Sequence, residues 1–195
     1  MPCFSFNLID THDVKCAEME EDLTQHIILA QEGDRDAYGK IYGIFYKRIY
    51  RYCHFNTRDR ELSQDICQET FVRAWRALPS FSITKGGSLQ AFLFRIARNL
   101  IIDNSRKKKT ASIENYENLA SNEDLAEAVD KRDENKKLKD AMVKLNEVDR
   151  QIITLHYFEE MSGSEIAKVV GIREGALRVR THRIIKKLKD LMEEK

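Results

Sequence analysis

Proline and glycine are scarce in this sequence, and their scarcity narrows the range of possible folds. Two prolines and eight glycines occur in 195 residues, so few positions interrupt a helix. Apolar residues recur every three or four positions rather than every second one, which is the spacing of amphipathic helices. A chain of this length can bury one ordinary core or two small ones. We therefore expect an all-α protein of one or two domains.

Long apolar runs are absent as well. No stretch approaches the roughly 18 apolar residues that span a bilayer. The first 22 residues lack the basic start and apolar segment of a secretion signal. These absences predict a cytoplasmic protein without membrane insertion.

The sequence has no pattern typical of a metal site or a catalytic centre. No C-x-x-C pair and no histidine at ligand spacing accompanies the cysteines, which we interpret as free, partly buried thiols. His156 and Glu160 are spaced to share a metal, but without a third ligand they favour a solvent-facing pair. A Gly-rich phosphate loop and a Ser, His, Asp arrangement are also missing. We predict a binding protein with no catalytic residues, metal or cofactor. The four cysteines are Cys3, Cys16, Cys53 and Cys67.

Charge is distributed in alternating blocks, although the formal net charge is only +1. Residues 1–22 hold one base and six acids, and residues 110–139 hold five bases and eight acids. Residues 23–109 hold sixteen bases against eight acids, and residues 140–192 hold ten against eight. Because basic segments bind nucleic-acid phosphates, the two basic blocks indicate two modules that contact nucleic acid.

An acidic segment rich in Asn and Ser divides the chain. It has few large apolar residues, which is typical of a solvated linker. A flexible linker of this length lets two modules sit tens of ångströms apart, by the roughly 5 to 6 Å × √n scaling of flexible chains. We predict an acidic, disordered tail at 1–22, a helical bundle at 23–109, a flexible linker at 110–137 and a second helical module at 138–195.

The first module contains an amphipathic helix that follows a loop. Residues 89–101 repeat apolar side chains at helical spacing, and Ser88 is placed to cap the helix. The preceding loop, 79–88, contains a proline and a Gly-Gly pair. The polar face of the helix carries Arg95, Arg98, Asn99 and Asp103.

The second module has the pattern of a helix-turn-helix. Ser162 and Glu165 are spaced as a capping box, in which each side chain bonds a backbone N–H group near the helix start. Gly171 ends this short helix, and a longer helix is expected from about Arg173 to Leu191. One face of the longer helix is basic and suits the phosphates and base edges of a DNA major groove. That face carries Arg178, Val179, His182, Arg183 and Lys186.

Two long parts of the sequence resemble one known family. Residues 65–78 (DICQETFVRAWRAL) and 90–103 (QAFLFRIARNLIID) closely resemble region two of the bacterial extracytoplasmic-function sigma factors. Residues 145–191, with YFE at 157–159 and SEIA at 164–167, resemble region four of the same family. The two parts stand in the family's order and with its spacing, so the resemblance is specific.

The resemblance implies a subunit that binds RNA polymerase core and directs it to promoter DNA. A region-two helix would dock on the clamp helices of the largest polymerase subunit, and early region-four helices would meet the flap of the second-largest. The residues implied in core binding are Asp65, Gln68, Glu69, Arg73 and Arg76. Those implied at the minus-ten element are Ser82, Lys85, Arg95, Arg98 and Asn99. Those implied at the minus-thirty-five element are Arg173, Arg178, Val179, His182, Arg183 and Lys186.

Three positions of the second module depart from the family's common pattern. Arg173 and Ala176 stand where many relatives have small hydroxyl residues, and Val179 replaces a frequent serine. We expect Arg173 to substitute as a phosphate contact, and the promoter preference does not transfer from relatives.

Two other functions are alternatives to a sigma factor: a stand-alone helix-turn-helix regulator and an interaction protein without DNA binding. A stand-alone regulator would need a sensing module with an apolar pocket or a dimer stripe, whereas the first module carries a basic helix. An interaction protein such as an anti-sigma factor fits poorly with sixteen bases in residues 23–109. A sigma factor is the main hypothesis, and an anti-sigma factor that clasps both modules is left open as a partner.

Overall fold

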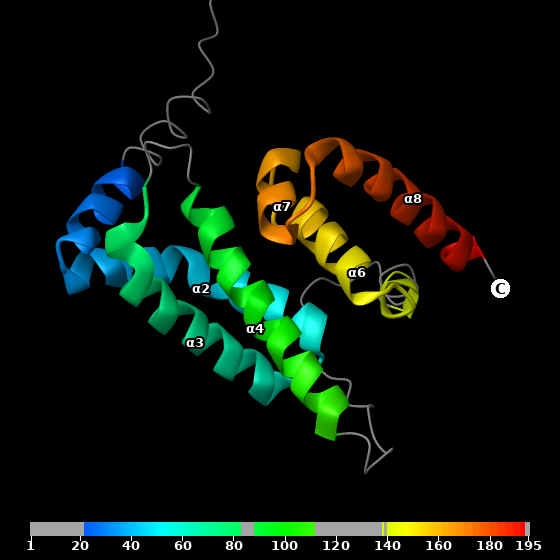
Figure 1. Ribbon diagram of the computed structural model, residues 1–195, viewed down its shortest axis with the longest axis horizontal. Helices are drawn as coiled ribbons and strands as arrows, with labels where there is room; N and C mark the ends of the chain where they lie inside the picture. Colours follow the sequence, from blue (N-terminus) through cyan, green and yellow to red (C-terminus); the bar gives the residue numbers. More distant parts are fainter. Residues whose placement is uncertain (1–21, 83–87, 112–137, 139, 194–195) are drawn as a thin grey trace, which may run out of the picture.

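The computed structural model describes residues 22–82, 88–111, 138 and 140–193. Within these ranges every regular element is a helix, so the expected all-α fold is confirmed. The elements form two groups that pack against each other, residues 22–111 and residues 138–193 (Figure 1). In chain order they are a helix at 22–31, α2 (Arg35–Thr57), α3 (Arg60–Ala77), the 3₁₀ turn η1 (Leu78–Ser80), α4 (Leu89–Ala111), a helical turn at 140–143, α6 (Glu147–Ile153), the π-helix η2 (Thr154–Phe158), α7 (Gly163–Val170) and α8 (Glu174–Glu193).

Side-chain caps fix where the helices of the first group begin. The Asp34 carboxylate accepts hydrogen bonds from backbone N–H groups in the first turn of α2. Asp59 caps α3 in the same way. Ser88 caps α4 as the sequence predicts, because its Oγ accepts from the Ala91 N–H group at 3.2 Å. Each cap satisfies a backbone donor that the first helical turn leaves unpaired.

The predicted helix-turn-helix is present in the second group. Ser162 and Glu165 form the capping box of α7. Gly171 ends α7 with a φ of 77°, a left-handed conformation that costs glycine no steric strain. The next helix, α8, begins at Glu174, one residue later than expected. Its apolar stripe is buried against α6 and α7, so its opposite face is turned to solvent.

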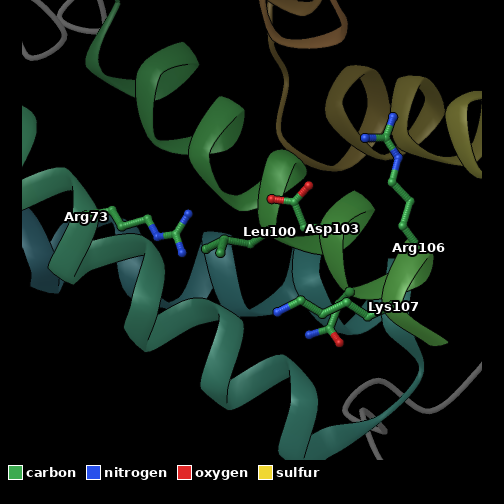
Figure 2. A pocket seen from close by; sticks show the side chains of 6 residues that line it. Arg73, Leu100, Asp103, Arg106 and Lys107 are labelled. Carbon is green, nitrogen blue, oxygen red and sulfur yellow. The ribbon is translucent and has the colours of Figure 1, made fainter. Parts of the chain in front are cut away.

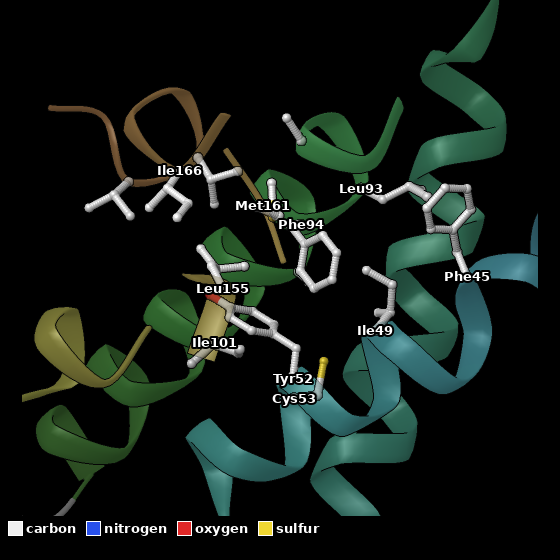
Figure 3. Close-up of a cluster of buried hydrophobic side chains, with 14 of the residues drawn as sticks. Phe45, Ile49, Tyr52, Cys53, Leu93, Phe94, Ile101, Leu155, Met161 and Ile166 are labelled. Atoms are coloured by element: carbon white, nitrogen blue, oxygen red, sulfur yellow. The ribbon is translucent and has the colours of Figure 1, made fainter. Parts of the chain in front are cut away.

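One apolar cluster runs through both groups (Figure 3). The rings of Tyr52 on α2 and Phe94 on α4 meet edge to face with centroids 5.2 Å apart. From the second group, Leu155, Met161 and Ile166 belong to the same cluster. Helix α7 packs on α4, and α6 with η2 packs on α2. Although a flexible linker would let the modules sit far apart, in this structure they share a core, because contact removes both apolar surfaces from water.

The cysteines in the described part of the chain are buried and free. These are Cys53 and Cys67, which agrees with the prediction of unpaired thiols, whereas Cys3 and Cys16 lie outside the described residues. Burial raises the pKa of Cys67 to about 12 and also raises the pKa of Cys53. Both groups are therefore protonated, unreactive thiols at neutral pH.

The described helices include none that is both long enough and apolar enough to cross a membrane. The tail predicted at 1–22 and the linker predicted at 110–137 lie almost wholly outside the described residues.

Candidate DNA and polymerase interfaces

The predicted recognition face of α8 is exposed along its length. All the predicted side chains of this face are exposed, and Val179 keeps 54% of its surface accessible to solvent. They are Arg178, Val179, His182, Arg183 and Lys186. Arg173 is exposed just before the helix begins. The buried positions of α8 lie on the other side, at Leu177, Ile184 and Leu188. The structure therefore brings the predicted minus-thirty-five residues together on one accessible face.

An ion pair holds α8 against α6. Arg180 Nε donates to Asp149 Oδ1 at 2.7 Å. Asn146 caps α6 through the Asp149 N–H group and also donates to the Asp149 carboxylate, at 2.6 Å. A hollow of about 580 Å³ between α6 and α8 is lined by Asp149, Val179 and Arg180, among others. Arg180 thus holds α8 against α6, a role that the basic pattern of α8 alone does not reveal.

Three of the predicted minus-ten residues, Arg95, Arg98 and Asn99, lie on α4, and they differ in exposure. Arg95 and Asn99 are exposed. Arg98 is half-buried, and its Nε donates to Oε1 of Gln151 on α6 at 3.0 Å. Ser82 is half-buried at the end of the described loop, and Lys85 lies outside the described residues. The face that should read DNA is therefore partly engaged with the second helical group.

A hollow of about 340 Å³ lies between this loop and α4. Its lining includes Phe81 and Phe92, whose ring centroids are 5.0 Å apart, together with Ser82 and Arg95. Aromatic rings beside a cationic group are a common surface for an unpaired base. Lys168 from α7 also lines the hollow, so both helical groups border it.

The predicted core-binding residues form a charged face on α3. Asp65, Gln68 and Arg76 are exposed. Glu69 and Arg73 form an ion pair one turn apart, with 2.7 Å between Arg73 Nε and Glu69 Oε1. This exposed polar face is suited to a protein partner.

Two aromatic residues of α3 belong to the protein core. Phe71 is buried, and the Trp75 ring packs on Tyr38 at a centroid distance of 4.8 Å. Both are therefore packing residues.

A further hollow of about 290 Å³ extends from α3 to the far end of α4 (Figure 2). Arg73 enters it from α3, and Arg106 and Lys107 enter from α4 beside Asp103. The predicted core-binding face therefore continues into a basic surface.

Among the described residues, a buried charge belongs to Glu159, for which the sequence predicts no role. The Glu159 carboxylate is 0% exposed. Arg48 Nε donates to its Oε2 at 3.1 Å, and Arg51 donates to its Oε1 at 2.9 Å from Nε and 2.8 Å from Nη2. Both arginines also donate to backbone carbonyl oxygens, Arg48 to Glu159 and Arg51 to Phe158. We call Arg48, Arg51 and Glu159 the latch, because they join α2 to the second group.

Glu165 forms another bond between the groups. Its Oε1 accepts from Ser88 Oγ at 2.5 Å, and its Oε2 accepts from the N–H and hydroxyl groups of Ser162. Burial alone would raise the pKa of Glu165, but these donors and nearby Lys168 stabilise the carboxylate and lower it overall. The residue that caps α7 thus also bonds the cap of α4.

Among the described residues, no group of three or more His, Cys, Asp or Glu side chains is arranged to hold a metal ion. His156 and Glu160 are both exposed, as the sequence predicts.

Comparison with known proteins identifies the family. The family model for Sigma-70 region 2 matches residues 41–111, and that for Sigma-70 region 4 matches residues 135–188. The ECF RNA polymerase sigma factor SigW of Bacillus subtilis is 31% identical over 189 residues, which cover 89% of this chain and all of SigW. This chain belongs to the ECF RNA polymerase sigma factors. The sigma factor thus acts in promoter recognition and transcription initiation together with RNA polymerase core.

Other relatives agree with this assignment. The ECF RNA polymerase sigma factor BldN of Streptomyces coelicolor is 30% identical over 167 residues. These cover 84% of the sigma factor described here but 63% of BldN, so the chain spans less than two thirds of BldN's length.

Two solved structures share the fold of the sigma factor. CnrH in complex with the cytosolic domain of CnrY has a TM-score of 0.68 at 24% identity and covers 88% of this chain and 97% of that one. RpoE in complex with the anti-sigma factor NepR, from Bartonella quintana, has a TM-score of 0.67 at 21% identity. The match covers 80% of this chain and 97% of that one.

Proposed function

We propose that this sigma factor divides its work among three surfaces of two regions. Region two, residues 23–109, binds polymerase core with the charged face of α3. It binds the minus-ten element with the minus-ten surface, which we define as Ser82, Lys85, Arg95, Arg98 and Asn99. Region four, residues 138–195, binds the minus-thirty-five element with the exposed face of α8. The protein works by binding in the cytoplasm and catalyses no reaction.

The exposed basic face of α8 is the observation that carries the proposal. A capping box and a left-handed glycine fix the turn before this helix, and the Arg180–Asp149 ion pair holds it on α6. Residues 173–189 contain seven Lys or Arg against one acid. A rigid helix of this charge density suits the DNA major groove, where arginine forms bidentate bonds with guanine.

The charged face of α3 supports the proposed contact with RNA polymerase core. Its charged side chains stand on a helix whose other side is fixed in the core by Ile66, Phe71 and Ala74. An anti-sigma factor is a further expected partner, since the two sigma factors that share this fold were solved with CnrY and NepR.

Dependence on core polymerase tests this proposal. The purified chain is mixed with promoter DNA selected from a random library, with and without core, and DNA binding and transcript formation are measured. Specific binding and initiation are expected chiefly with core. Equal binding without core would instead indicate a stand-alone helix-turn-helix regulator.

A charge reversal on α3 tests the polymerase surface separately. Glu69→Lys should abolish core binding without unfolding the chain, because the exposed Glu69–Arg73 pair contributes at most about 1 kcal/mol to stability. Glu61→Lys is the matched control, since Glu61 is exposed in the first turn of the same helix. Core affinity is measured by fluorescence anisotropy of labelled sigma factor. If Glu69→Lys binds core as well as the control does, Glu69 is not at the interface.

A further inference from the structure

The helix at residues 22–31 is bonded to the turn that ends α3, next to the loop that precedes α4 (Figure 1). The Gln31 amide nitrogen Nε2 donates to the carbonyl oxygen of Leu78 at 2.9 Å and to that of Phe81 at 2.6 Å. These residues follow Gln31 in the chain by 47 and 50 positions. One side chain therefore ties both ends of the η1 turn to a helix that is distant in sequence.

Backbone hydrogen bonds fix the place of Gln31. Gly33, with a φ of 98°, ends the helix in the left-handed conformation. The N–H groups of Gly33 and Asp34 donate back to the carbonyl oxygens of Ala30 and Leu29. Asp34 then caps α2 directly. Gln31 thus stands on a helix end that cannot shift without breaking these bonds.

The two carbonyl groups lie where the helical bonding of α3 and η1 stops. The Leu78 oxygen also accepts from the Phe81 N–H group at 3.0 Å. Phe81 itself has an extended backbone, with φ −74° and ψ 133°. A primary amide carries two N–H bonds and can donate to both oxygens at once, whereas an ionised glutamate only accepts and a methionine has no donor. The donors of glutamine are therefore what this position uses.

Phe81 extends this anchor to the hollow between the loop and α4. Its ring lies against that of Phe92, with centroids 5.0 Å apart. Both rings line the hollow of about 340 Å³, together with Ser82 and Arg95. Because Gln31 holds the Phe81 carbonyl group, it also holds the backbone from which the ring and the next residue project. The placement of the aromatic wall relative to Arg95 therefore depends on Gln31.

We propose that Gln31 is a positioning residue for minus-ten recognition, which holds Phe81 so that the hollow discriminates among unpaired bases. An aromatic wall stacks on any base, since every base has a π-face. Choice among the bases therefore depends on where the polar groups at the edge of the hollow lie relative to that wall. This inference rests on the proposed binding of the minus-ten element by Ser82 and Arg95. Gln31 acts through Phe81 and needs no contact with DNA.

Two substitutions in the full-length protein remove the donors. Gln31→Met keeps an unbranched side chain without a donor, and Gln31→Glu puts a carboxylate where both carbonyl oxygens repel it. Gln25→Met and Gln25→Glu are the matched controls, because Gln25 is exposed on the same helix. Gln31 is only half-buried, so both of its variants should keep their helices, which circular dichroism checks.

Base discrimination is measured with holoenzyme on promoter DNA that the wild type selects from a random library. Each minus-ten position is changed in turn to the other three bases, and competition binding gives the ratio of affinities. Gln31→Met should lower this ratio at one position by about fivefold or more, the size expected for one or two lost hydrogen bonds. Gln31→Glu should lower it further. Discrimination at the minus-thirty-five element and affinity for core should match the controls.

A double-mutant cycle tests whether Gln31 acts through Phe81. Phe81→Leu removes the ring and should lower discrimination at the same base position. In that background Gln31→Met should have no further effect. An independent measurement uses 4-fluorophenylalanine introduced at position 81 of the free protein. Its fluorine resonance should shift in Gln31→Met and stay in place in Gln25→Met.

The outcomes separate this inference from the proposed function. If Gln31→Met keeps wild-type discrimination at every minus-ten position, the inference is wrong while the proposed function stands. An equal loss at every position of both elements, or losses that add in the cycle, would show a general structural role and would also overturn the inference. The proposed function fails by a different result, namely that Arg95→Ala holoenzyme opens promoters as well as wild type.

Discussion

The two proposed DNA-reading surfaces of this sigma factor meet their surroundings in different ways. The face of α8 is open to solvent, with Val179 more than half exposed. On α4 the central arginine, Arg98, is bonded to a fully buried glutamine of region four. Both helices are amphipathic and basic on one side, so their own sequences do not explain the difference. The packing of one region on the other decides which basic face is available.

The largest expected effect comes from truncating Phe94, a side chain of α4 in the apolar core that both regions share. Phe94 is fully buried between α2 and region four (Figure 3). Phe94→Ala should lower the free energy of unfolding by about 3 to 5 kcal/mol. Urea denaturation is followed by circular dichroism, which reports both regions, and by fluorescence of Trp75, the single tryptophan, which reports region two.

The two signals should change together, because the regions share a core. Val143→Ala, at an exposed position of region four, should shift the midpoint little. Separate midpoints for the two signals in the wild type would mean that the regions fold independently.

The exposed face of α8 gives the next largest expected effects. Arg178→Ala should weaken binding of holoenzyme to the minus-thirty-five element by about 1 to 3 kcal/mol at one base position. Lys186→Ala should weaken all sequences evenly and lower the salt slope by about one. Both are measured by competition binding with single-base promoter variants. An even loss across all base substitutions for Arg178→Ala would contradict its role in base reading.

Substitution of Arg98, on the face of α4 that contacts region four, should have two effects, one on the free protein and one on the holoenzyme. Arg98→Ala removes a charge-assisted bond, so it should weaken the contact between regions by about 1.5 kcal/mol and loosen the free protein. It should also reduce promoter opening by holoenzyme, as seen by permanganate reactivity of unpaired thymines.

Arg95→Ala is the matched control for Arg98→Ala, because Arg95 is exposed on the same helix. It should reduce opening without loosening the free protein. Equal behaviour of the two variants in scattering would show that Arg98 does not hold the regions together.

The smallest expected effect comes from Glu165, which caps α7 and also accepts a hydrogen bond from Ser88 at the start of α4. Because its pKa is lowered in the folded protein, its carboxylate stabilises the fold above the unfolded-state pKa, and that contribution is lost as pH falls through the folded value. Glu165→Gln should therefore cost about 1 kcal/mol at neutral pH and little below the folded pKa. Urea midpoints measured across pH 3 to 7, an approximate window around the ordinary glutamate pKa, check this. A pH-independent difference would contradict a role for the charge.

The elements of the fold were predictable because their signals are local. Ser162, Glu165 and Gly171 lie within ten residues and specify α7 and its turn almost alone. The spacing of apolar residues likewise identified the buried side of α4. The π-helix η2 after α6 has no such local signal.

The contact between regions was not predictable from local signals. The helical wheel placed Arg98 on the polar side of α4, which is correct, but polarity does not say whether that side meets water or a buried Gln151. Glu159 has its partners more than a hundred residues away. Such pairs depend on how two finished modules pack, and hydrophobic periodicity carries no information about that packing.

The distance between the regions tests the central claim most directly. Spin labels are introduced through non-natural amino acids at two exposed positions, Gln64 on α3 and Lys189 on α8. Their separation is then measured by pulsed electron paramagnetic resonance in the free protein and in complex with core polymerase. We expect one narrow, short distance in the free protein and a distance longer by tens of ångströms in the complex. A broad distribution in the free protein, or the same distance in both states, would show that the regions do not pack together in the free protein and separate on core polymerase.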